Sequence, residues 1–141
     1  MRVGLIGGGD IARLFLEQSR RGAISDAEVV AVMGRTDLSR GKALAQEFGI
    51  AFVTERDKLI ATRPDIVIEA ASHAAVREHV EELLSKGSAV VVLSAGALVD
   101  DHLRERLERA SARHRALLYV PSGGIGGLDA LKAACTAGVD E

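Results

Sequence analysis

The sequence is poor in aromatic residues, cysteine and basic charge. It has three Phe, one Tyr and no Trp, and its net charge is −2 with a sequence isoelectric point of about 6.1. Nucleic-acid-binding domains usually carry a basic surface or clustered aromatic side chains, so this composition argues against that class. Cys135 is the only cysteine, which excludes an internal disulfide and is consistent with a reducing compartment.

Long hydrophobic runs are also missing. A membrane-spanning helix needs about 20 predominantly apolar residues in succession, and no stretch of the chain approaches this length. The apolar run at residues 3–6 is too short for the core of a signal peptide and leads directly into glycines. We therefore expect a soluble, cytoplasmic protein with neither a membrane nor a nucleic acid as partner.

What the chain does have is an alternation of short apolar runs and amphipathic segments. Its 141 residues are enough for one domain with a substantial core. Several runs are apolar at every position, as in parallel strands that are covered on both faces. The predicted strands are residues 2–6, 28–33, 51–53, 65–70, 89–93 and 116–120.

Helical patterns lie between these strands. Asp100 is placed to cap one helix, and Thr36 or Asp37 to cap another that ends near Phe48. Strands joined by helices predict an α/β Rossmann fold, a doubly wound parallel six-stranded sheet in the order 3-2-1-4-5-6 with helices on both faces. The predicted buried helix positions are Ile11, Leu14 and Phe15, then Val76, Val80, Leu83 and Leu84, and then Leu103, Leu107 and Ala110.

The most informative motif is a glycine turn between the first strand and the first helix. Gly7, Gly9 and Ala12 have the spacing G-x-G-x-x-A. In dinucleotide-binding proteins the first glycine permits the turn, the second leaves room for the pyrophosphate, and the third small residue lets the helix pack closely. The helix start at Asp10 and Ile11 would then face the anion. We expect the Asp10 side chain to turn away and cap the helix. The alternative is a glycine-rich turn that binds nothing.

The end of the second predicted strand indicates which coenzyme is bound. NAD-binding proteins usually place an acidic residue there, roughly 20 residues beyond the glycines, on the ribose hydroxyls. This chain has Arg35 and Thr36 near that place. A guanidinium can pair with a 2′-phosphate and a threonine can add a hydrogen bond, so the sequence favours NADP. NAD remains possible if Arg35 points elsewhere and Asp37 meets the ribose.

Ligands of such sheets lie beyond the carboxyl ends of the strands, between strands 1 and 4. The segments expected there are residues 7–12, 34–37, 70–73, 94–97 and 122–124. Among them we expect Ala70, Ala71, Ser72 and Ser94 to contact the coenzyme, with the serines bonding to ribose or nicotinamide. His73 also lies there, but a polar residue at a helix start explains it more simply than catalysis. No cluster has metal-ligand spacing, so we predict no metal site and no catalytic residue.

Four segments together resemble one family. They are residues 3–9 (VGLIGGG), 68–72 (IEAAS) with 75–78 (AVRE), 91–98 (VVLSAGAL) and 121–132 (PSGGIGGLDALK). Over nearly its whole length the chain resembles the N-terminal NAD(P)-binding domain of L-aspartate dehydrogenases. The last segment is the most specific, whereas the first occurs in many dehydrogenases.

The resemblance implies oxidation of L-aspartate to iminoaspartate, which hydrolyses to oxaloacetate and ammonia or feeds NAD biosynthesis. It also implies a coenzyme contact at Gly124, where the family usually has alanine. Asp10 and Arg35 depart from the family's commonest pattern, and Ala12 replaces a common glycine. In the family a following α/β domain supplies the catalytic histidine, a coenzyme-contacting asparagine and most substrate and subunit contacts.

No residue of this chain matches that catalytic histidine. We expect residues 1–121 to form the NAD(P)-binding domain, and residues 122–141 to form a hinge and helix leading to a catalytic domain that is absent from this chain. Binding of L-aspartate and homo-oligomer formation would both require that domain. The sequence leaves open whether a longer protein carries it or the native protein has none.

The leading hypothesis is therefore the coenzyme-binding domain of an L-aspartate dehydrogenase-like oxidoreductase, with little or no turnover by itself. The alternative is a stand-alone nicotinamide-nucleotide-binding or regulatory module without catalysis. An S-adenosylmethionine methyltransferase also has a glycine-rich first turn. That class would place an acidic ribose ligand after the second strand and usually has an antiparallel last strand, and neither feature is clear here.

Overall fold

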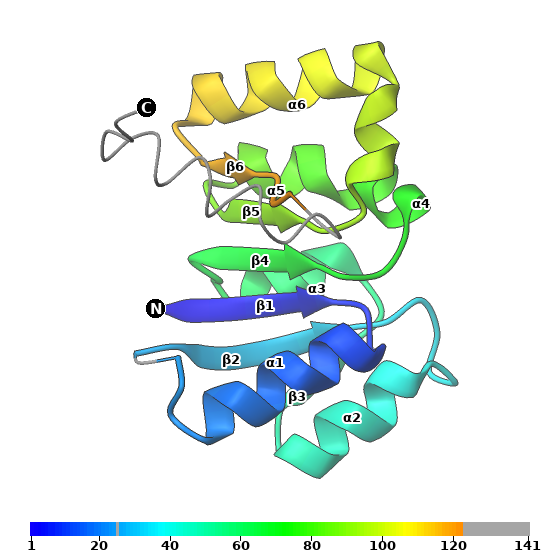
Figure 1. The fold of residues 1–141 in the computed structure, drawn as a ribbon, viewed down its shortest axis with the longest axis vertical. Helices are drawn as coiled ribbons and strands as arrows, with labels where there is room; N and C mark the ends of the chain where they lie inside the picture. The colour runs from blue at the N-terminus through cyan, green and yellow to red at the C-terminus, as the bar shows by residue number, and fades with distance from the viewer. Residues whose placement is uncertain (25, 123–141) are drawn as a thin grey trace, which may run out of the picture.

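The computed structural model describes residues 1–24 and 26–122, which form one parallel sheet with helices on both faces (Figure 1). The strand order is β3-β2-β1-β4-β5-β6, and every neighbouring pair is parallel. The predicted Rossmann topology is confirmed, and the parallel β6 argues against a methyltransferase. The strands are β1 (Arg2–Ile6), β2 (Glu28–Met33), β3 (Ala51–Val53), β4 (Ile66–Glu69), β5 (Ala89–Val92) and β6 (Leu118–Tyr119).

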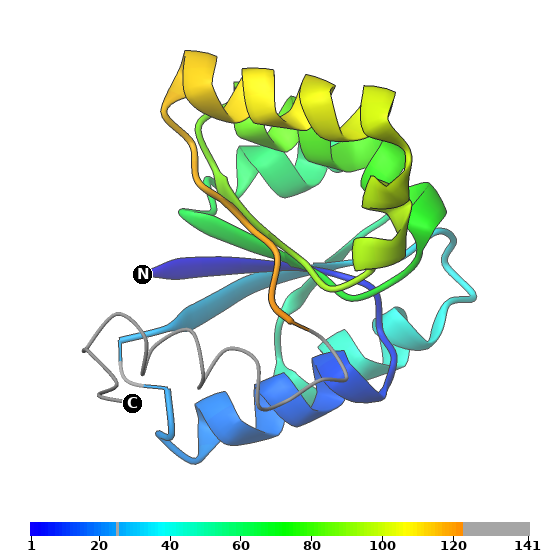
Figure 2. The ribbon, with the colours of Figure 1, turned by 45° about the horizontal axis from the view of Figure 1, so that its top comes forward.

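The helices lie in two layers, one on each face of the sheet. The pair α1 (Asp10–Arg20) and α2 (Arg40–Phe48) covers one face, and α3 (Arg56–Ala61), α5 (Glu81–Ser85) and α6 (Asp101–His114) cover the other (Figure 2). A short helix α4 (His73–Ala75) and a π-helical turn η1 (Val76–Val80) run directly into α5, and a 3-10 turn η2 (Ala95–Val99) precedes α6. None of the helices in the described part of the chain is long and apolar enough to span a bilayer.

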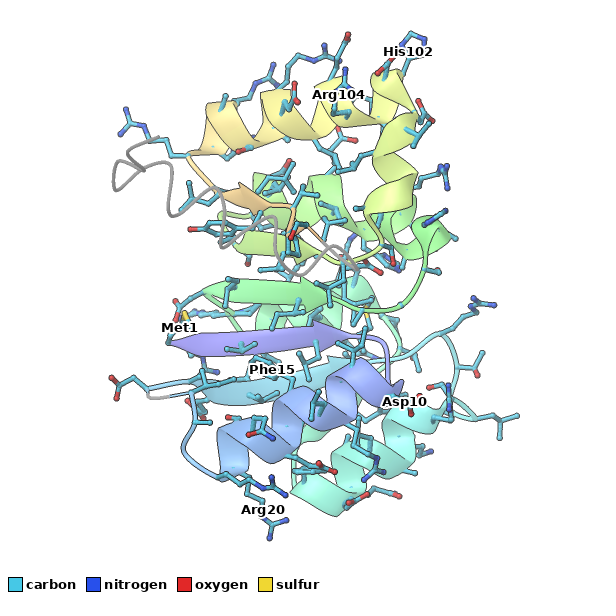
Figure 3. The ribbon with its side chains drawn as sticks, viewed as in Figure 1. Met1, Asp10, Phe15, Arg20, His102 and Arg104 are labelled. Carbon is cyan, nitrogen blue, oxygen red and sulfur yellow. The ribbon has the colours of Figure 1, made fainter. Side chains whose placement is uncertain are left out.

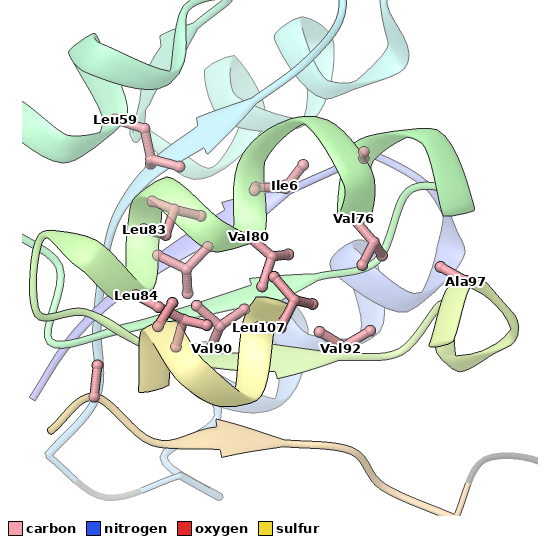
Figure 4. Packing of buried hydrophobic residues seen from close by; sticks show 14 of the residues in the cluster. Ile6, Leu59, Val76, Val80, Leu83, Leu84, Val90, Val92, Ala97 and Leu107 are labelled. Carbon is pink, nitrogen blue, oxygen red and sulfur yellow. The ribbon is translucent and has the colours of Figure 1, made fainter. Parts of the chain in front are cut away.

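Each helical layer buries its own apolar cluster. The larger cluster packs Leu83 and Leu107 against Val90 and Val92 of β5 (Figure 4). The predicted faces at Val76, Val80, Leu83 and Leu84 and at Leu103, Leu107 and Ala110 are buried, which confirms them. The smaller cluster joins α1 and α2 to β1 and β2. Burial of these side chains on both faces explains why the central strands are apolar at nearly every position.

The prediction for the buried face of α1 was wrong. Ile11 and Leu14 are 57% and 56% exposed, whereas Ala12 and Leu16 are almost completely buried. Phe15, labelled in Figure 3, is partly buried against the smaller cluster. The helix is therefore turned so that its small Ala12 meets the sheet, as the glycine motif requires. The helix therefore packs closely against β1 through Ala12, and the larger side chains of Ile11 and Leu14 stay exposed.

Helix ends were predicted with mixed success. The Asp100 carboxylate accepts the N–H of Leu103 at 3.2 Å, as expected, and Gly49 ends α2 with φ +70°. The cap of α2 was predicted wrongly, because Ser39 rather than Thr36 or Asp37 is its N-cap. Helix α3 was not predicted, because six residues give too short a periodic pattern.

Candidate functional site

The glycine turn after β1 is built by close backbone contacts. Gly7 has φ +106°, a conformation that L-residues with a side chain rarely adopt, and its N–H donates to the Met33 carbonyl at 2.9 Å. A Cβ added at Gly7 would lie 2.5 Å from the Ala70 carbonyl oxygen. A Cβ at Gly8 would lie 2.2 Å from the Gly41 Cα, in α2. Close backbone packing within the protein therefore explains why the first two positions are glycine.

Gly9 differs from its two neighbours because, among the described residues, no atom occupies the space that its Cβ would fill. A Cβ added there meets no atom within 4 Å. Its φ of −85° and ψ of −168° are open to any residue, so neither strain nor packing demands a glycine. Gly9 is also the N-cap of α1, where the first N–H groups of the helix have no partner inside the helix. The space beside Gly9 is thus a place where an anion can approach bare backbone.

Asp10 does not cap α1, contrary to our expectation. It is the first residue of the helix, and the N-cap, Gly9, makes no side-chain cap hydrogen bond. Asp10 is exposed at the carboxyl end of the sheet (Figure 3). A carboxylate in the first turn of a helix is favoured by the helix dipole, so it needs no further partner there. The side chain of Ile11 is exposed as well.

A cavity of about 330 Å³ opens at the same edge of the sheet. It brings together four predicted site residues, namely Gly7, Arg35, Ala71 and Ser72. The lower end of the size range of small-molecule sites is about 300 Å³. The lining also includes Gly34, from the expected segment 34–37. The remaining lining residues, which the sequence analysis did not place at the site, are Ile6, Met33, Thr54, Ala74, Ala75, Glu78 and His79. These residues come from strand tips and from α4 and η1, so only the tertiary structure brings them together.

Other hollows lie elsewhere on the described surface. One of about 510 Å³ lies between the last turns of α1 and α2, and one of about 590 Å³ lies at the amino ends of β4 and β5. Both are remote from the carboxyl edge, where ligands of such sheets bind. A smaller hollow of about 300 Å³ includes Gly9 and Asp10 together with Arg40. We place the site at the glycine turn and the 330 Å³ cavity.

Arg35 and Thr36 follow β2 and are both exposed. Arg35 lines the cavity and has no ion-pair partner among residues 1–24 and 26–122. Asp37, the residue that would meet an NAD ribose in the alternative interpretation, instead pairs with Lys42 at 3.5 Å. The cationic side chain of Arg35 therefore lines the cavity, whereas Asp37 is paired with Lys42 on the surface.

Glu69 is the main site residue that the sequence analysis missed. This last residue of β4 is 0% exposed and accepts four hydrogen bonds from the tips of β4 and β5. Its Oε1 accepts from the N–H of Ala71 at 2.8 Å, the N–H of Ser72 at 2.9 Å and the hydroxyl of Ser94 at 2.9 Å. Its Oε2 accepts from the N–H of Ser94 at 3.0 Å. An acid at the end of an otherwise apolar strand was the available signal.

The backbone of Ala70 contacts the glycine turn at the carboxyl end of the sheet. Its N–H donates to the Ile6 carbonyl at 2.9 Å, and its carbonyl faces Gly7. Ser72 is the N-cap of α4, where its hydroxyl accepts the N–H of Ala75 at 3.2 Å. The residues predicted from the β4 and β5 tips are thus brought together. Gly124 and the predicted hinge and helix at residues 122–141 lie, apart from Ser122, outside the described residues.

Two histidines border the site. His73 begins α4, as expected for a polar residue at a helix start, and its ring lies against the Gly96 backbone, where an added Cβ would be 2.6 Å from Nε2. His79 lines the cavity, and burial is the main reason that its pKa lies below the usual value, with Glu78 opposing the shift and Arg56 adding to it. Burial therefore favours the neutral imidazole of His79. The described residues hold no cluster of potential metal ligands.

Comparison with known proteins decides the family. Residues 3–121 match the family model described as homoserine dehydrogenase, NAD binding domain. The chain belongs to this family of NAD-binding domains. The match runs from β1 to the residues just after β6, so it covers the glycine turn, the cavity and the Glu69 network.

The resemblance to L-aspartate dehydrogenases is also confirmed. The chain is 41% identical over 144 residues to the L-aspartate dehydrogenase of Methanothermobacter thermautotrophicus, covering 99% of this chain and 53% of the relative. It is 38% identical to L-aspartate dehydrogenase 2 of Bordetella pertussis, covering 99% of this chain and 51% of the relative. The chain thus spans about half the length of these relatives.

A solved structure shows the same fold at lower identity. Biliverdin reductase from Synechocystis sp. PCC 6803, crystallised with biliverdin and NADP+, superposes with a TM-score of 0.75 at 24% identity. The superposition covers 96% of this chain and 42% of that chain. Identity at this level supports the Rossmann fold alone and says nothing about substrate.

Proposed function

We propose that this chain is the coenzyme-binding domain of an L-aspartate dehydrogenase-like oxidoreductase and that it prefers NADP. When bound, the nicotinamide would accept the hydride released as L-aspartate is oxidised to iminoaspartate. The products, oxaloacetate and ammonia after hydrolysis or iminoaspartate for NAD biosynthesis, follow from the same resemblance. A cytoplasmic location, suggested by the single cysteine, belongs to the proposal as well.

The open space at Gly9 is the observation that carries this proposal. Gly7 and Gly8 are explained by contacts with Ala70 and Gly41, but no contact or strain explains Gly9. A pyrophosphate approaching the N-terminus of α1 would fill that space and accept from its free N–H groups. The identity to L-aspartate dehydrogenases supports the substrate.

The 330 Å³ cavity would hold the adenosine end of the coenzyme. It extends from Gly7 toward the β2 tip, where Arg35 lies, and is closed on its other side by α4 and η1. With the pyrophosphate at the turn, the 2′ position of the ribose would come toward Arg35. The Arg35 guanidinium has no ion-pair partner among the described residues, and it fits a phosphate there better than it fits a neutral diol.

Arg35→Ala is expected to weaken NADP binding about tenfold and to change NAD binding by less than about twofold, because one charged hydrogen-bonding partner of the 2′-phosphate is lost. Titration calorimetry with both coenzymes measures this directly. Arg113→Ala, which removes an exposed arginine of α6, is the matched control and leaves both affinities unchanged. Equal losses for NADP and NAD in Arg35→Ala would contradict the NADP preference.

Residues 1–141 are expected to bind the coenzyme without oxidising L-aspartate, because no residue of this chain matches the catalytic histidine that the resemblance to the family implies. The measurement is NADPH or NADH formation with saturating L-aspartate, at a protein concentration shown to bind the coenzyme. Aspartate-dependent formation of reduced coenzyme above the blank would contradict the expected inactivity while leaving the coenzyme site intact.

A further inference from the structure

The hydrogen bonds around Glu69 determine which way the Ser94 hydroxyl points. Backbone N–H groups can only donate, and they point at both carboxylate oxygens of Glu69, from Ala71 and Ser72 to Oε1 and from Ser94 to Oε2. Both oxygens therefore act as acceptors. The Ser94 hydroxyl, 2.9 Å from Oε1, must donate its single proton to Glu69.

Ser94 is left with acceptor capacity alone. No group in the described part of the chain donates to its Oγ, so its lone pairs are available to a ligand that brings its own proton. Ser72 has the opposite polarity, since its hydroxyl accepts the N–H of Ala75 at 3.2 Å and keeps a proton to donate. Ser94 thus favours a ligand group that donates a hydrogen bond, whereas Ser72, at the same edge of the sheet, favours one that accepts.

The positions of the strand tips indicate which ligand group meets Ser94. This step rests on the proposed coenzyme site. Arg35 lies beyond β2, on one side of β1, and Ser94 lies beyond β5, on the other side. A dinucleotide whose pyrophosphate is at the turn and whose adenosine points toward Arg35 has its nicotinamide at the β4 and β5 tips.

We propose that Ser94 accepts a hydrogen bond from the carboxamide N–H2 of the nicotinamide ring and that Glu69 is the positioning residue that fixes this polarity. A pyridine ring with a carboxylate in place of the carboxamide presents only acceptor oxygens to Ser94. The site therefore discriminates between the amide and acid forms of the coenzyme.

The test compares the affinities of two nucleotides that differ only at this group. NADP and nicotinic acid adenine dinucleotide phosphate are titrated into the protein by calorimetry, and the same pair without the 2′-phosphate is measured in parallel. The wild type is expected to bind the amide form about tenfold more tightly or better, because a mismatched polar contact is costly in a built site. Ser94→Ala is expected to bring the ratio of the two affinities close to one.

Two further variants separate a specific role from a general loss of structure. Ser85→Ala removes a hydroxyl that donates to the Glu81 carbonyl at 2.9 Å, far from the site, and leaves the ratio unchanged. Glu69→Gln keeps an oxygen that can accept at the Oε1 position, so the preference for the amide persists. Loss of the preference in Glu69→Gln but not in Ser94→Ala would assign discrimination to charge alone and overturn the proposal.

The ratio of the wild-type affinities for the amide and acid forms tests the proposal even if a variant does not fold. Equal affinity for the amide and acid forms overturns the role of Ser94 while the coenzyme site stands. Failure of every one of these nucleotides to bind contradicts the proposed function itself. Tighter binding of the acid form would mean that Ser94 donates to the ligand, which also overturns the proposal.

Discussion

Replacing Gly9 with alanine is expected to weaken NADP binding about a hundredfold while the protein stays folded. The new methyl group would occupy the open space beside Gly9 and push the pyrophosphate away from the first turn of α1. Loss of two charge-assisted hydrogen bonds to backbone N–H groups costs about 3 kcal/mol or more, which corresponds to about a hundredfold in affinity.

Stability of the Gly9→Ala variant is expected to fall by less than about 1 kcal/mol. The backbone angles of Gly9 suit alanine, and the only expected cost is that alanine is a poorer N-cap than glycine. Calorimetric titration of NADP and a thermal melt of the same sample provide both measurements. Unchanged NADP affinity in a folded Gly9→Ala protein would show that no pyrophosphate binds at this turn.

Replacing Gly8 with alanine is expected to give the opposite result, a large loss of stability. The new Cβ would lie 2.2 Å from the Gly41 Cα and 2.3 Å from the Gly41 N, so backbone must move on one side of the contact. Overpacking of this kind costs about 3 kcal/mol or more, because no flexible side chain can give way. For a chain of this size the melting temperature falls by about 10 °C.

Gly41→Ala is the matched control for Gly8→Ala. Its added Cβ would lie 3.3 Å from a Val32 methyl and 3.6 Å from the Gly8 Cα, which a small shift accommodates. Alanine also favours the helical conformation of α2 by about 1 kcal/mol relative to glycine. We therefore expect Gly41→Ala to melt near the wild-type temperature. Equal melting temperatures for Gly8→Ala and the wild type would contradict the close backbone contact.

The three consecutive glycines therefore have three different physical roles. Gly7 allows a positive φ against the Ala70 carbonyl, Gly8 lets α2 approach the turn, and Gly9 alone leaves space on the outside. The sequence motif predicted the tight turn at Gly7 and the open space at Gly9. The role of Gly8 was not predictable, because its partner Gly41 lies 33 positions later in the chain and comes near only through the packing of α2.

The sequence determined the sheet. Apolar runs broken by glycines and separated by helical patterns were sufficient to predict the strand order, and β1, β2 and β3 begin and end where the runs do. This follows because a strand buried on both faces must be apolar at each position, which is a local property of the chain. The glycine turn was predictable for the same reason, since its conformation depends on a few adjacent residues.

The tertiary structure decided the rest of the site. It turned α1 so that Ala12 rather than Ile11 meets the sheet, it buried Glu69 between two strand tips, and it placed His79 in the wall of the cavity. Each of these depends on contacts between residues far apart in sequence, whose energies a local pattern does not contain. Sequence alone thus predicted where a dinucleotide would lie, but only packing set the direction of the hydrogen bonds that would recognise it.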